Sequence, residues 1–139
     1  TALGQSPLRS ATVFNFFRPG YVPPNTTLAD AGLLAPELQI VDETSVASYI
    51  NFMQRVISSA GISDVKVDYS ALVAIAKDST ALLNEINTLL CAQELSAEVL
   101  LTIKNALDTI SVTTATGVLN RVYAALTLVM ACPQYIVLK

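Results

Sequence analysis

Side chains suited to binding gather near the start of the chain, in residues 3–24. Four of the nine aromatic residues fall within residues 14–21, where an asparagine and an arginine are interleaved with the rings. A guanidinium beside phenylalanines can stack on a ring, fork onto a carboxylate or meet an anionic ligand. The residues that we expect to contact a ligand or a partner here are Gln5, Arg9, Asn15, Phe16, Phe17, Arg18 and Tyr21.

The sequence leaves three roles open for Arg18. Its guanidinium pairs internally with Glu37, Asp42 or Glu43 and fixes the loop, or it contacts a ligand, or it contacts another part of a longer protein. The internal pair is favoured, because a buried guanidinium cannot be neutralised and must find a partner. We therefore predict that Arg18 is ordered and at least partly shielded, with a carboxylate or a backbone carbonyl as its partner. Arg18→Ala is then expected to lower stability by about 3 kcal/mol or more.

The chain supplies no catalytic set or metal site of its own. It has no histidine and two cysteines, so neither a Ser-His-Asp arrangement nor a Cys/His zinc site can be built from it. The adjacent carboxylates Asp42 and Glu43 are explained by capping at a helix start. Asp64, Asp68 and Asp78 do not match the spacing of a calcium loop. We expect no cofactor and no catalysis by this chain alone.

Cys91 and Cys132 match no metal or redox spacing. The favoured interpretation is that they are two small hydrophobic residues, buried at helix ends. A disulfide is the alternative if the parent protein is exported.

The composition of the chain argues against several classes of protein, namely nucleic-acid-binding and membrane-spanning proteins. The chain has 139 residues, enough for one domain, with 53% hydrophobic residues, 14% charged residues and a net charge of −3. The few basic residues form no stripe, so nucleic acid is not expected as a partner. The uncharged run at residues 122–138 is short and broken by Pro133, so a membrane span is not expected. Because the chain begins without an initiating methionine, we expect it to be a fragment of a longer protein.

The elements that must position these side chains are helices. Prolines and a glycine stop helical periodicity in the opening stretch, so residues 1–43 are predicted to be an irregular aromatic and proline-rich segment, with its connector, packed on a bundle. Residues 44–139 are predicted to form an all-α compact bundle of four to five helices, from apolar spacing of three and four and from caps at Asp68, Asp78 and Ser96. The expected ranges are 44–60, 69–77, 79–92, 96–110 and 114–131. Among the residues expected to face inward are Val46, Ala60, Leu89 and Ala106.

Several motifs resemble a known family. They are LGQSP, TVFNFFRPGYVPP and LLAPELQIVDETSVASYINFM in the first part of the chain, then LSAEVLLTIKNAL and the closing RVYAALTLVMACPQYIVLK. Together they resemble the C-terminal part of the bacterial family called domain of unknown function 1800, over essentially the entire chain. One departure is Cys132 before Pro133, where members of that family commonly have serine.

The resemblance implies a longer, exported parent protein in a periplasmic or extracellular setting, and it supplies no catalytic residue. Two functions remain open. The chain is a non-catalytic structural or interaction module that contacts the N-terminal remainder of the parent or forms a homodimer, or it is one wall of an active site whose catalytic residues lie upstream. Aromatic density at residues 14–21 favours a surface that another surface covers.

Overall fold

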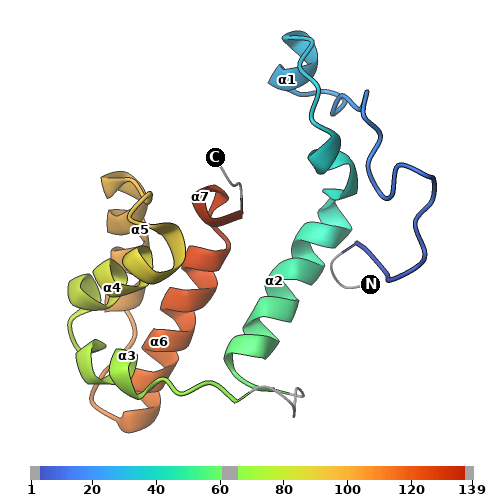
Figure 1. The fold of residues 1–139 in the computed structure, drawn as a ribbon. Coiled ribbons are helices and arrows are strands. Elements are labelled where there is room, and N and C mark those ends of the chain that lie inside the picture. Colours follow the sequence, from blue (N-terminus) through green and yellow to red (C-terminus); the bar gives the residue numbers. More distant parts are fainter. Residues whose placement is uncertain (1–3, 61–65, 137–139) are drawn as a thin grey trace. The chain divides into compact units, whose positions relative to one another are not determined.

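The computed structural model describes residues 4–60 and 66–136, and Figure 1 shows it as a ribbon. In these ranges the regular elements are helices, and one isolated antiparallel bridge joins Thr12 and Asn15. The all-α class predicted from the sequence is confirmed. The chain divides into two compact units, Thr1–Phe52 and Met53–Lys139, which are described separately.

The second unit is a bundle around one hydrophobic core. Helix α4 (Ser79–Cys91) packs against both α5 (Ala97–Asp108) and α6 (Ala115–Met130), and α5 packs against α6. The short helices α3 (Ser70–Ile75) and α7 (Pro133–Ile136) each contact α4 and α6. The largest side chains that are fully buried in this core are Leu82, Ile86, Leu107, Val122 and Val129.

Side-chain caps begin the long helices of the bundle. Asp78 accepts hydrogen bonds from the amides of Thr80 and Ala81 at the start of α4, and Ser96 accepts one from Val99 at the start of α5. These caps satisfy amides that have no partner within the helix, and both were predicted. Asp68 accepts from the amide of Ser70 at 2.9 Å, although the cap position itself is occupied by Tyr69.

The five predicted helices are present, with ends that lie within three residues of the predicted ranges. Helix α2 is Glu43–Ile57, and the expected glycine cap at residue 61 lies outside the described residues. Three short elements complete the chain: α1 (Thr27–Asp30), the 3-10 helix η1 (Pro36–Ile40) and α7. Pro133 was expected only to end the preceding helix, but it also begins α7, because proline suits the first helical turn.

Four residues that were expected to face inward are exposed: Val46, Ala60, Leu89 and Ala106. An apolar stripe shows on which side of a helix a residue lies, but not whether a neighbouring element extends far enough to cover it. Leu89, near the end of α4, remains 63% exposed.

The buried charge of the bundle is Arg121, on the apolar face of α6 and only 5% exposed. Its guanidinium donates to the backbone carbonyls of Ala76, Lys77 and Ile110, at 3.4, 3.1 and 2.7 Å. Those carbonyls lie just past the last turns of α3 and α5, where helices carry partial negative charge and unpaired acceptors. Arg121 therefore ties α6 to the ends of two other helices.

Candidate functional site

The opening segment, defined here as residues 4–24, is a succession of turns without a helix or strand. Four backbone amides each donate a hydrogen bond to the carbonyl three residues earlier in the chain. The pairs are Arg9 to Ser6, Asn15 to Thr12, Phe17 to Phe14 and Tyr21 to Arg18. Proline cannot donate such a bond and disfavours a helix before it, so the pattern breaks repeatedly. The irregular backbone that was predicted here is confirmed.

Two residues other than glycine in this segment have left-handed backbone conformations. Asn15 has a φ of 64°, which asparagine tolerates better than most residues. Leu8 has a φ of 58°, which is uncommon for a large apolar side chain. These conformations set the direction in which the chain displays Leu8 and Asn15.

Residues further along the first unit hold the segment at its far end. The Gln39 side-chain oxygen accepts from the amide of Arg18 at 2.6 Å, and the carbonyl of Tyr21 accepts from the amide of Ala35 at 2.9 Å. The segment is therefore tied to η1 and to the turn before it.

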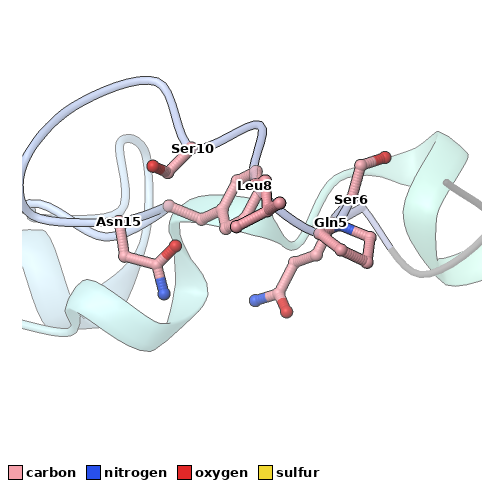
Figure 2. A pocket seen from close by; sticks show the side chains of 7 residues that line it. Gln5, Ser6, Leu8, Ser10 and Asn15 are labelled. Carbon is pink, nitrogen blue, oxygen red and sulfur yellow. The ribbon is translucent and has the colours of Figure 1, made fainter.

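A hollow of about 560 Å³ lies along the first half of the segment (Figure 2). In Figure 2 the side-chain amides of Gln5 and Asn15 point to the same side of the chain, next to Leu8. The residues that line the hollow are Gln5, Ser6, Pro7, Leu8, Ser10, Asn15 and Phe16. It is therefore lined by amides, hydroxyls and apolar groups, without an ionisable side chain.

The structure brings together three of the seven residues predicted for this site. Gln5, Asn15 and Phe16 line the hollow, whereas Arg9, Phe17, Arg18 and Tyr21 do not. Phe16, Phe17 and Tyr21 are half-buried, and the others are exposed.

The prediction that Arg18 is shielded and paired internally is wrong for the described residues. Its side chain is exposed, and the ion pair found in the described ranges joins Lys104 to Asp108 instead. The backbone amide of Arg18, rather than its guanidinium, makes the fixing contact, with Gln39. An exposed guanidinium keeps its hydration, so it has no need of a buried partner.

The apolar residues that the segment exposes most are not among those predicted for the site. Leu8 and Val13 are 104% and 96% exposed, and Phe14 is 57% exposed. Apolar periodicity identifies a covered face only in a regular helix or strand, so an irregular segment gives no signal of which side chains project. The aromatic density did indicate the region.

The family comparison covers nearly the whole chain. The model of the family "Protein of unknown function (DUF1800)" matches residues 1–137. The chain belongs to the DUF1800 family. Neither the curated proteins nor the solved structures contain a significant match to it.

Within the described parts of this DUF1800 chain, no group of three or more His, Cys, Asp or Glu side chains is placed to hold a metal ion. The described helices include none that is long and apolar enough to cross a membrane. The opening segment itself offers amides, hydroxyls, two guanidiniums and apolar surface, which suit hydrogen bonding and burial rather than proton transfer.

Two further hollows lie in the second unit. One of about 590 Å³ lies between the end of α2 and α6, and Arg55, Asn120 and Tyr123 are among its lining residues. The other, of about 510 Å³, includes Asn84, Asn87, Thr88 and Gln93. Asn87 is already used within the fold, since its side-chain oxygen accepts from the amide of Leu95 at 3.2 Å. Neither hollow is lined by any of the seven residues predicted for the site.

Proposed function

We propose that this DUF1800 chain is a non-catalytic helical module of a larger exported protein, and that its opening segment binds a protein surface. The observation that carries the proposal is the weak core of the first unit. Among residues 4–52, the buried residues are Pro23 and Ala35. A unit this poor in buried residues has little burial free energy to offset the entropy of ordering its chain.

Exposed apolar side chains in the opening segment supply the surface that would be covered. Leu8, Val13 and Phe14 are all more than half exposed. Exposed apolar clusters beyond a few hundred Å² are rare on monomers and commonly mark an interaction site. Burying such side chains stabilises a complex by about 25 cal/mol per Å² of apolar surface, before the costs of association.

Charge indicates the kind of surface that would fit. The opening segment carries Arg9 and Arg18 and no carboxylate, so its charge is +2. Both arginines are exposed, beside the apolar residues. The complementary partner is an apolar protein surface with carboxylates at its rim, since opposite charges favour encounter and register. We assign this surface to the N-terminal remainder of the parent protein, with a second copy of the chain as the competing partner.

A binding experiment with matched variants tests the proposal. The chain is mixed with the separately produced N-terminal remainder, and affinity is measured by calorimetry. We expect the double substitution Val13→Ser and Phe14→Ser to weaken binding by about tenfold or more, which is a loss of about 1.4 kcal/mol. Leu89→Ser, which changes a comparably exposed residue on α4, serves as the control and should leave affinity unchanged.

Two outcomes would count against this interface. No binding to the remainder, together with a concentration-dependent dimer in sedimentation, would assign the surface to a second copy. A monomer in which hydroxyl-radical footprinting finds Leu8, Val13 and Phe14 protected would mean that the chain covers them itself.

The second candidate function, one wall of an active site, is favoured by the amide- and hydroxyl-lined hollow. Asn15→Ala and Gln5→Ala in the full-length protein would then lower its activity while leaving assembly unchanged. If both variants retain full activity, this second function is excluded.

A further inference from the structure

The two cysteines of the chain belong to the same hydrophobic core of the bundle. Cys91 is the last residue of α4 and is 6% exposed, and Cys132 directly precedes α7 and is half-buried. Cys91 belongs to the hydrophobic core, and Cys132 packs against that core. Helix α4, which ends at Cys91, is in contact with α7, which begins directly after Cys132.

The electrostatics of the thiols agree with this placement. Burial raises the pKa of the Cys91 thiol, and the charge of Cys132 raises it further. Burial also raises the pKa of Cys132. A charge affects a neighbouring pKa appreciably only at short range, so this influence agrees with the place of both cysteines in one core. Both thiols are free in the structure.

We propose that Cys91 and Cys132 are a modification site, at which a reactive disulfide oxidises them to an intramolecular disulfide that fastens α7 to the end of α4. This inference does not depend on the proposed binding function. Both interpretations of the cysteines, buried hydrophobes and disulfide partners, then describe two states of the same pair.

The more accessible thiol sets the order of the reaction. Cys132 loses its proton, and its thiolate attacks one sulfur of the oxidant, forming a mixed disulfide and releasing the first oxidant thiol. Cys91 then loses its proton, and its thiolate attacks the Cys132 sulfur and releases the second oxidant thiol. The two cysteines lose two electrons and two protons in total, and the oxidant disulfide gains them as two thiols.

The surroundings of Cys132 permit this order. Its thiol donates to the carbonyl of Leu128 at 3.2 Å, a weak hydrogen bond that the reaction gives up. Cys91, in contrast, is too buried to meet an oxidant in solution, so it reacts only through Cys132.

Treatment of the folded chain with oxidised glutathione tests the site. After quenching, unfolding and alkylation, we expect wild-type chain to carry no alkyl group and no glutathione, and peptide mapping to join Cys91 to Cys132. The melting temperature should rise by roughly ten degrees, because the bond closes a long loop. Adding a reductant should reverse both changes.

Single variants separate the two steps. Cys91→Ser should stop at a glutathione adduct on Cys132, whereas Cys132→Ser should remain reduced while folded. The proposal is overturned if wild-type chain accumulates the mixed disulfide on Cys132, forms covalent dimers only, or keeps both thiols free. It is equally overturned if Cys132→Ser reacts as fast as Cys91→Ser, because Cys91 would then not depend on Cys132.

Discussion

Arginine shows how differently one residue type behaves at two positions of this chain. Arg18 is surrounded by aromatics in the sequence and is exposed, whereas Arg121 lies within an apolar helix stripe and is buried. The guanidinium of Arg121 satisfies three carbonyls at the ends of α3 and α5. Its Nε is buried without a described partner, so the site is held by the two terminal nitrogens.

Replacing each arginine should separate these roles. We expect Arg121→Met to lower the free energy of unfolding by about 3 kcal/mol, since it leaves buried carbonyls without donors. Arg18→Ala should change it by less than about 0.5 kcal/mol, as surface substitutions usually do. Urea unfolding followed by circular dichroism measures both. If Arg18→Ala lost as much stability as Arg121→Met, the result would support the predicted internal pair of Arg18.

Asp108 contributes a stability to the bundle that depends on pH. Its pKa is lowered mainly by hydrogen bonds from Lys104, at 2.5 Å, and Ser79, at 2.6 Å, and the charge of Arg121 lowers it further. A carboxylate with a lowered pKa stabilises the fold above its ordinary pKa, and that stabilisation is lost as the pH falls through the lowered value.

We therefore expect Asp108→Asn to be less stable than wild type at neutral pH, with the difference shrinking as the pH falls below the ordinary aspartate pKa. Urea midpoints measured at neutral and acid pH test this. Glu85→Gln, at an exposed carboxylate of α4, is the control. A difference that stays constant with pH would mean that Asp108 acts through shape rather than charge.

At the scale of elements, the start of α6 depends on close backbone approach. Thr114 caps this helix by accepting from the amide of Gly117 at 3.0 Å. A Cβ on Gly117 would lie 2.1 Å from the carbonyl oxygen of Ser111, which belongs to the backbone. That carbonyl cannot rotate away as a side chain could, so the turn before α6 requires glycine.

Gly117→Ala should consequently destabilise the chain by about 1–3 kcal/mol, the range for overpacking, although alanine is the better helix former. Gly20→Ala, at a position with no atom within 4 Å of the added Cβ, should be close to neutral. Thermal unfolding of the two variants makes the comparison. A more stable Gly117→Ala chain would show that the turn relaxes without cost.

At the scale of the whole molecule, stability is distributed unevenly between the two units. The largest fully buried side chains lie on α4, α5 and α6, whereas Pro23 and Ala35 are the buried residues of positions 4–52. Amides exchange slowly where opening them requires global unfolding and quickly where few apolar contacts hold the backbone.

Hydrogen exchange of the full chain should therefore find the slowest amides in α4 and α6 and fast exchange throughout residues 4–24. Mass spectrometry with peptide resolution distinguishes these regions. Adding the proposed partner, an N-terminal remainder of a longer protein, should slow exchange in residues 4–24 if it binds there. Slow exchange in that segment of the chain alone would contradict the description of a weakly held unit.

Much of the bundle follows from local rules that sequence expresses directly. Helical spacing and capping residues predicted the five main helices to within three residues, because caps and apolar stripes act within a few positions of the residues that carry them. The absence of histidine similarly determined that no histidine chemistry is available. The motifs were sufficient for the family, which the match over residues 1–137 confirms. The packing of residues 1–43 on the bundle stays a prediction.

Tertiary structure decided the features that depend on neighbours distant in sequence. Only packing could reveal that Arg121 reaches the ends of α3 and α5, that Leu89 is left uncovered, and that Leu8 and Val13 project from an irregular segment. The place of Cys91 and Cys132 at one hydrophobic core is of the same kind. Burial depends on what surrounds a side chain. The periodicity of a segment does not specify which other element packs against it.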